Sequence, residues 1–384
     1  LAEVGNVTAS GSGSAATIDT AINNGSATDA LTITISAGTA DISNLVSLNG
    51  KTNIAVVATA TNTITDTTNI GANLTTAGIT WGATPAITTG TAATFTSDQT
   101  SHVVAAGNIA DDTTLTLAGS AIFTVTGLVG DIASTSTGGM AVTLASVATS
   151  TVAFGTDTTG THTVNANALT NGQELTLTGS DIGAVTLVGG DLDASTYAGV
   201  LTVTATSGTN EIKVGSAGST VTGGAGADTI TLGAGIDTLK RNGDGSTDGS
   251  DTVSGFSVTT ETDVIDLITN GATDSVTGYE ELATGTINTG TAMLVYTAND
   301  LPAATEDGIE DIFDGTTANL QLAAASDVLY LAASDGTHTY IFEIVAAAGN
   351  AEFTAADDVA TLMITLSGIT DASTLSGANF LDFA

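Results

Sequence analysis

The sequence predicts an all-β-dominated fold: a parallel β-solenoid, ending in a small C-terminal α+β domain. Thr, Ala, Gly, Ser and Val dominate the 384 residues, and Pro occurs only twice. Such a composition is typical of many short strands joined by turns of small residues. In addition, large apolar residues recur at a constant nine-residue spacing from Val203 onward. A fixed period of this kind is typical of stacked repeats.

Residues 1–200 are expected to form a Thr/Ala/Gly-rich β domain made of solenoid rungs. Short β-branched segments, such as 31–35, 54–57 and 62–65, alternate there with turns of small residues, without a strict repeat. A β-sandwich module in the first 90 or so residues stays open as an alternative, because Trp81 and Pro85 mark a local change of composition.

Residues 201–256 contain the most specific pattern. Residues 223–231 match the nonapeptide G-G-x-G-x-D-x-U-x at every fixed position, where U is a large apolar residue. The next nine residues keep Gly235 and Asp237, and two weaker nines precede them. Five residues, 241–245, interrupt the count before Gly249 and Asp251 resume it. The large apolar residues that keep the period are Val203, Ile212, Val221, Ile230 and Leu239.

This pattern predicts a coil in which each nine forms a turn and then a short strand. Successive nines would lie on opposite sides, so turns two repeats apart would stack and bring their oxygen atoms together. Stacked carboxylates and carbonyls suit a hard cation with six to eight oxygen ligands, which favours Ca²⁺ over Mg²⁺. The alternative is a metal-free solenoid in which glycines merely form the turns. The expected calcium-site residues are Gly208, Asn210, Gly224, Gly226, Asp228, Gly235, Asp237, Asp244, Asp248, Asp251, Asp191 and Asp193.

Within this set, Asp228 is expected to share one ion with Asn210 and a second with Asp244, and Asp237 to share one with Asp251. Asp191 and Asp193 form a separate acidic turn, for which a solvated corner is an equal alternative. Residues 242–248 alternate oxygen-bearing side chains as an EF-hand loop does. Because Val253 stands where that loop needs an acidic residue, we interpret the segment as an insertion in the coil that can still hold calcium.

The nonapeptides resemble the calcium-binding β-roll of the RTX (repeats-in-toxin) family, whose members leave Gram-negative cells by type I secretion. Residues 251–256 and 262–267 resemble the segment that commonly closes such a roll. The resemblance implies calcium as the ligand and an extracellular or cell-surface location. It does not imply an activity, because RTX rolls occur in toxins, proteases, lipases, adhesins and surface-layer proteins.

Residues 257–384 are expected to form the C-terminal α+β domain. The pattern predicts a helix over 303–313, a hairpin of 327–331 with 340–344, and a strand over 359–366. The last ten residues resemble the uncleaved C-terminal export signal of type I secreted proteins. No basic-then-apolar leader begins at Leu1. Either the N-terminus is missing or processed, or export relies on the C-terminal segment; we expect the second, with a trimmed or incomplete N-terminus.

Charge and missing motifs narrow the function. Asp and Glu number 40 against 4 Lys and Arg, a formal net charge of −36, which makes nucleic acid and anionic lipid improbable partners. The sequence has no Cys, no H-E-x-x-H, no G-x-S-x-G and no apolar stretch long enough to cross a membrane. We therefore expect no enzymatic activity and no membrane insertion.

The expected function is that of a calcium-dependent, self-assembling extracellular structural protein, a surface-layer or surface-filament subunit whose partner is itself. The RTX resemblance and the solenoid-like composition favour this class. A secreted RTX adhesin or carbohydrate-binding protein is the alternative, and a cell-surface polysaccharide is a further partner that the sequence leaves open.

Overall fold

The computed structural model confirms the prediction of a parallel β-solenoid, which has about nine turns. The chain divides into two compact units, Leu1–Val185 and Thr186–Ala384. The structure describes residues 8–22, 27–36, 38–54, 56–57, 61–66, 79–80, 93–97, 101–107, 109–155, 160–241, 248–259, 261–267, 278–283, 285–286, 291–298, 300–313, 320–321, 328–345 and 359–381. The predicted division at residues 200 and 256 stays a prediction.

The first unit begins with a parallel sheet that two helices accompany. The strands are β1 (Thr8–Gly13), β2 (Ala30–Ile35), β4 (Val56–Val57) and β6 (Ile79–Thr80). The helices are α1 (Ala15–Ala21), which Ser14 caps, and α2 (Ile42–Asn49). Ile18, Ile33 and Leu45 belong to the core that these elements share. The pairs are parallel, which favours rungs over the antiparallel sheets of a sandwich. Trp81 lies outside the described residues.

Two further parallel sheets form the solenoid of the first unit. One contains β3 (Gly38–Asp41), β5 (Thr61–Asp66), β7 (Ala93–Ser97), β9 (Thr114–Gly119), β11 (Asp131–Ser136), β13 (Thr149–Ala153) and β15 (Glu174–Thr178). The other contains β8 (Ser101–Ala105), β10 (Ile122–Leu128), β12 (Met140–Leu144) and β14 (Thr161–Asn165). β16 (Ile182–Leu187) contains the boundary between the units. Inward residues such as Leu115, Phe123 and Val152 are fully buried.

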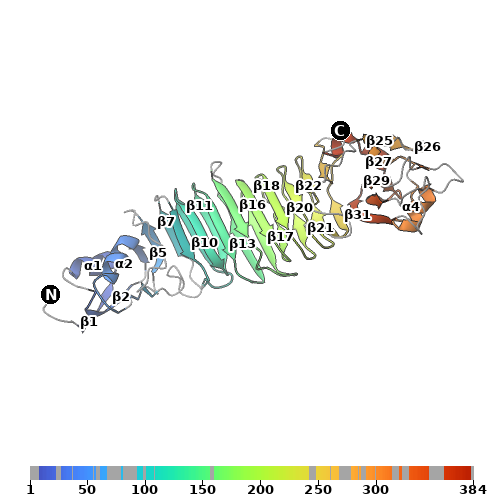
Figure 1. The fold of residues 1–384 in the computed structure, drawn as a ribbon. Helices are drawn as coiled ribbons and strands as arrows, with labels where there is room; N and C mark the ends of the chain where they lie inside the picture. Colours follow the sequence, from blue (N-terminus) through green and yellow to red (C-terminus); the bar gives the residue numbers. More distant parts are fainter. Residues whose placement is uncertain are drawn as a thin grey trace. The chain divides into compact units, whose positions relative to one another are not determined.

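The second unit also contains stacked rungs, with shorter strands, and Figure 1 shows these rungs side by side. One sheet contains β18 (Leu201–Ala205), β20 (Thr220–Thr222), β22 (Thr238–Lys240) and β24 (Val264–Asp266). The other contains β17 (Asp191–Asp193), β19 (Glu211–Lys213), β21 (Thr229–Thr231) and β23 (Asp251–Ser254). Val203 pairs with Val221, and Ile212 pairs with Ile230. Repeats two apart therefore stack, as the nine-residue period predicts.

Beyond β23, the second sheet of this unit contains both parallel and antiparallel pairs. Its further strands are β31 (Val359–Ser367), β30 (His338–Val345), β29 (Val328–Ser334), β27 (Thr291–Tyr296) and β25 (Gly278–Leu282). β30 is antiparallel to both of its neighbours, and the other pairs are parallel. β26 (Gly285–Thr286) pairs separately with β28 (Leu320–Gln321). The predicted hairpin is confirmed as β29 with β30, and the predicted strand as β31. The predicted helix is observed as α4 (Glu306–Phe313), whose Ile309, Ile312 and Phe313 are buried.

The end of the chain packs against the last rung of the first sheet. Two 3₁₀ helices, η1 (Ala372–Thr374) and η2 (Gly377–Asn379), precede Phe380, which is fully buried. The amide of Leu381 donates to the carbonyl of Ile265 in β24 at 3.1 Å. The C-terminal segment therefore covers the open edge of β24. An uncovered strand edge could pair with another chain.

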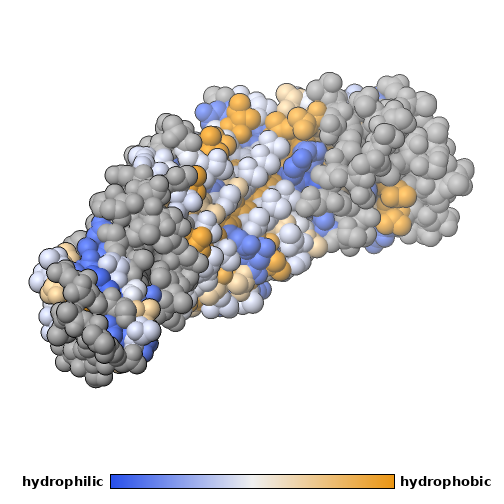
Figure 2. Space-filling model, turned by 60° about the vertical axis from the view of Figure 1, so that its left-hand side comes forward, coloured by the Kyte–Doolittle hydropathy of each residue, from blue (hydrophilic) through white to orange (hydrophobic). Residues whose placement is uncertain are grey.

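The described surface is mixed in character. Figure 2 shows hydrophilic and apolar residues interspersed on one face. Ile236 and Val200 are examples of large apolar residues that are more than half exposed. Among the described residues no helix is both long and apolar enough to cross a bilayer.

Candidate cation site in the acidic turns

The turns of the second unit place oxygen-bearing side chains in two columns. The sixth residue of each nonapeptide lies at the start of the short strand or directly before it, and Asp263 directly precedes β24 in the same way. Stacked strands therefore bring these residues together. We call Asn210, Asp228 and Asp251 the first ladder. Ser219, Asp237 and Asp263 form the second ladder. All six of these residues are buried.

Glycines let adjacent turns approach closely enough to form these ladders. Gly224 and Gly226 have φ values of +81° and +124°, which L side chains rarely adopt. A Cβ on Gly226 would lie 1.7 Å from the carbonyl oxygen of Gly208 in the turn below. Gly208 and Gly235 also have positive φ. These predicted residues therefore form the turns, and their part in metal binding stays a prediction.

Within each ladder, one carboxylate oxygen accepts a hydrogen bond from the backbone amide of the preceding ladder residue. Asp228 Oδ1 accepts from Asn210 N at 2.7 Å, and Asp251 Oδ1 from Asp228 N at 3.0 Å. In the second ladder, Asp237 Oδ1 accepts from Ser219 N at 2.6 Å, and Asp263 Oδ1 from Asp237 N at 2.8 Å. Each ladder thus keeps its carboxylates in a fixed orientation along the stack.

Other oxygens in the ladders are buried and have no hydrogen-bond partner. These are Asp228 Oδ2, Asp237 Oδ2 and the amide oxygen Asn210 Oδ1. Burying a polar group without a partner is costly, and burying an unpaired charge costs more. A cation that accepts these lone pairs would remove the cost. These oxygens therefore fit a hard cation. Asn210 and Asp228, which were expected to share an ion, do lie next to each other.

Burial also changes the acidity of the ladder carboxyls. It raises the pKa of Asp228 to about 6 and the pKa of Asp237 to about 7. For Asp237 the nearby carboxylates of Asp263 and Glu261 raise the pKa further. Burial likewise raises the pKa of Asp251 to about 7, in spite of the opposing charge of Arg241. At neutral pH these groups hold negative charge poorly without a counterion.

The structure corrects one predicted pair. Asp237 was expected to share an ion with Asp251, but the two belong to different ladders: Asp237 stacks on Asp263, and Asp251 stacks on Asp228. β22 and β23 lie in different sheets, so the alternation of sides survives the insertion after Lys240 and only the residue count changes. Asp244 lies in this insertion, outside the described residues.

Asp248 and Asp251 instead face a basic side chain. The guanidinium of Arg241 is buried; its Nη1 donates to Asp251 Oδ2 at 2.9 Å, and its Nε lies 3.8 Å from Asp248 Oδ2. Asp251 Oδ2 therefore already has a hydrogen-bond partner, unlike Asp228 Oδ2. Sequence reasoning missed Arg241, because nothing in the insertion shows that its side chain turns inward.

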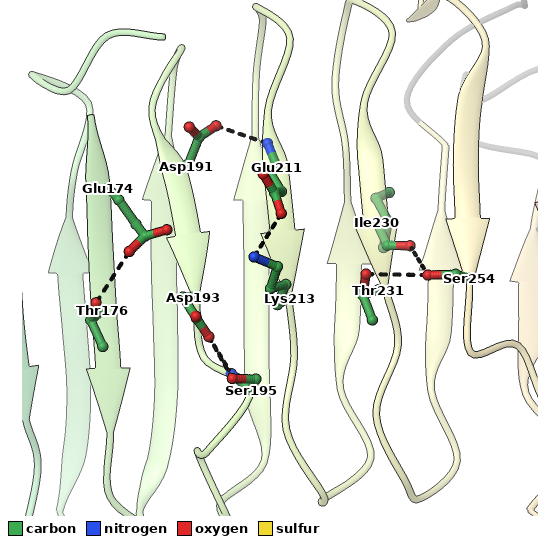
Figure 3. A network of polar contacts seen from close by, with 10 residues as sticks. All are labelled: Glu174, Thr176, Asp191, Asp193, Ser195, Glu211, Lys213, Ile230, Thr231 and Ser254. Atoms are coloured by element: carbon green, nitrogen blue, oxygen red, sulfur yellow. Dashed lines mark hydrogen bonds and ion pairs between the residues drawn. The ribbon is translucent and has the colours of Figure 1, made fainter. Parts of the chain in front are cut away.

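Asp191 and Asp193 lie apart from the ladders. They flank the inward-facing Leu192 on β17, so both carboxylates are on the outer face of the sheet (Figure 3). Asp191 Oδ1 accepts from Glu211 N at 2.8 Å, and Asp193 Oδ1 accepts from the amide and hydroxyl of Ser195 at 3.0 and 2.6 Å. The hydrogen bonds from Ser195 lower the pKa of Asp193. These local partners fit the solvated-corner alternative.

Sequence reasoning also missed Asp263, Glu261 and a buried histidine. His162 Nε2 lies 3.0 Å from Asp181 Oδ2, and both side chains are fully buried. The imidazole stacks on Phe154 with ring centroids 4.4 Å apart. The two partners are 19 residues apart and lie in successive turns, so a variable rung length hides the pair in the sequence.

Side chains alone do not complete a metal site in the described part of the chain. No group of three or more His, Cys, Asp or Glu residues there could hold an ion. A cation in a ladder would therefore take main-chain carbonyls in addition to one or two side chains, as hard cations commonly do. Comparisons with protein-family models, curated proteins and solved structures find no match to the chain.

Proposed function

We propose that the protein is a calcium-dependent, self-assembling extracellular structural protein, a surface-layer or surface-filament subunit. The observation that carries the proposal is the set of buried ladder oxygens without partners, Asp228 Oδ2, Asp237 Oδ2 and Asn210 Oδ1. They lie in stacked, glycine-formed turns of a chain with a net charge of −36. A hard divalent cation meets both needs, because it supplies charge and takes oxygen ligands.

Within the unit, two pairs of ladder residues would hold calcium. Asn210 and Asp228 offer an amide and a carboxylate oxygen in neighbouring turns, and Asp237 and Asp263 offer two carboxylates. Calcium bound there would neutralise carboxylates whose negative charge burial disfavours. The resemblance of the nonapeptides to the RTX β-roll supports calcium as the ion and export from a Gram-negative cell by the type I route.

Between subunits, charge controls approach. A chain with 40 acidic and 4 basic side chains repels its copies. Sodium chloride at about 0.15 M shortens the Debye length to about 8 Å, but it does not bridge carboxylates. Calcium can take ligands from two subunits at once. We therefore propose that calcium orders the turns of each subunit and also neutralises the surfaces that meet in the assembly.

Electron microscopy and sedimentation of the purified chain test this function. At about 0.15 M NaCl, we expect monomers or short pieces in chelator and ordered sheets or fibres after millimolar calcium is added. Magnesium at the same concentration is the control and should give much less assembly, because it demands smaller, near-octahedral sites. A chain that stays monomeric in calcium would contradict the proposal and favour the adhesin or carbohydrate-binding alternative.

A further inference from the structure

The insertion that interrupts the nonapeptide count places the single arginine of the chain inside the second unit. Arg241 directly follows β22, and its backbone amide donates to the carbonyl of Asp266 at 3.1 Å. Its side chain then runs inward to the first ladder, where it is only 2% exposed. Few arginines are buried to this extent without a set of acceptors that compensates the lost hydration.

The acceptors of the guanidinium are of the kinds that a hard cation takes. Nη1 donates to Asp251 Oδ2 and to the carbonyl of Met363 in β31, both at 2.9 Å. Nη2 donates to the turn carbonyl of Gly249 at 2.9 Å. The carboxylate of Asp248 lies 3.8 Å from Nε. One positive group thus gathers two carboxylates and two carbonyls around the last turn of the first ladder.

The second ladder has no such group. The chain has four basic side chains, and the three lysines pair elsewhere: Lys51 with Asp19, Lys213 with Glu211, and Lys240 with Asp266. Asp237 Oδ2 is nevertheless fully buried and without a hydrogen-bond partner. The two ladders therefore have the same turn geometry but differ in their counterion.

We infer that Arg241 is a built-in counterion that takes the place of a divalent cation between the turns of Asp228 and Asp251. Asp248 and Asp251 then bind the guanidinium rather than metal. The last turn of the first ladder keeps its structure without calcium. The last turn of the second ladder, at Asp237 and Asp263, needs calcium to stay ordered. This inference deepens the proposed function and, in the part that concerns the second ladder, rests on it.

The guanidinium also ties the repeats to the strands that follow them. Met363 lies in β31, which pairs with β23 in parallel register, Asp251 opposite Ile364. Arginine suits this role better than lysine, because its planar donors can serve several acceptors at once. A metal-independent contact here keeps β31 joined to the repeats even when the second ladder is disordered.

Two equivalent backbone amides report on the two ladders. Thr252 N donates to the carbonyl of Asp228, and Val264 N donates to the carbonyl of Asp237, each at 2.8 Å. Hydrogen exchange of both amides would be measured on the full chain, in chelator and in millimolar calcium. In the natural chain, we expect Thr252 to be protected under both conditions and the exchange of Val264 to slow at least about tenfold when calcium is added.

Arg241→Gln provides the decisive variant, with the calcium bound per chain measured in parallel by equilibrium dialysis. In this variant we expect the Thr252 amide to lose protection in chelator and to regain it in calcium. We also expect the variant to bind one more calcium ion per chain than the natural protein. The double variant Arg241→Gln, Asp251→Asn removes both charges and should protect Thr252 without calcium. It also serves as the reporter if Arg241→Gln fails to fold.

The outcomes separate the inference from the proposed function. Equal calcium dependence of Thr252 and Val264 in the natural chain overturns the inference, and so does an Arg241→Gln variant that binds no additional calcium. A third outcome is that the exchange of Val264 in the natural chain does not change with calcium, whereas the exchange of Thr252 in the Arg241→Gln variant does. This outcome contradicts calcium dependence of the natural protein. In that case the counterion role of Arg241 stands.

Discussion

Gly226→Ala is expected to destabilise the second unit far more than Gly336→Ala, although both glycines have positive φ. A Cβ at Gly226 would lie 1.7 Å from the carbonyl oxygen of Gly208, whereas nothing lies within 4 Å of a Cβ at Gly336. Both variants incur backbone strain of about 1–3 kcal/mol. Gly226→Ala adds the cost of separating two stacked turns, about another 1–3 kcal/mol or more.

Urea unfolding followed by circular dichroism measures this difference, with calcium held constant. Gly336 is a matched control, because it lies in the same unit, at the turn between β29 and β30, with a φ of +84°. Similar midpoints for the two variants would show that the turns at Gly208 and Gly226 do not stack as described.

Asp237→Asn is expected to change the stability of the chain in opposite directions without and with calcium. In chelator at neutral pH the variant should be more stable than the natural chain by about 1–3 kcal/mol, because it removes a buried carboxylate whose Oδ2 has no hydrogen-bond partner. In millimolar calcium it should be less stable, because an anionic ligand is lost. A tenfold weaker affinity removes about 1.4 kcal/mol of calcium stabilisation.

The pH dependence follows from the same carboxyl. The pKa of Asp237 is raised from 3.8 to about 7 in the folded chain, so the folded state holds this proton more tightly than the unfolded state. The metal-free fold is therefore most stable below pH 3.8 as far as this group is concerned, and it loses that stability as the pH rises towards 7. In Asp237→Asn this loss should be smaller.

Thermal unfolding in chelator and in calcium, at several pH values, tests the reversal. Asp193→Asn is the matched control, because Asp193 is only partly buried, lies on the outer face and is already hydrogen-bonded to Ser195. It should change stability little in either condition. If Asp237→Asn shifts stability in the same direction with and without calcium, the expected role of this carboxylate as a calcium ligand is contradicted.

The regular part of the fold could be predicted because its period is local. Val203, Val221 and Leu239 recur every 18 residues and stack in one sheet, so spacing alone gives the register. The two N-terminal helices could not be predicted in this way. α1 has the sequence AATIDTA, whose Thr residues suit strands as well, and its position depends on packing Ile18 against β-strands.

The candidate site was predictable in its turns but not in its counterions. The pattern identified Asp228 and Asp237 and their glycines, because these residues lie within intact nonapeptides. Asp263 lies 26 residues after Asp237, beyond the insertion, so no period leads to it. Arg241 reaches Met363, 122 residues away, and such a contact is decided by tertiary packing alone.

The central claim is that calcium orders the acidic turns, and a calcium titration of the purified chain followed by far-ultraviolet circular dichroism tests it most directly. The account predicts that β signal increases with calcium, with a midpoint of about 10⁻⁴ to 10⁻³ M, the range of extracellular calcium modules, and much less with magnesium. A spectrum that is the same in chelator and in calcium would contradict it.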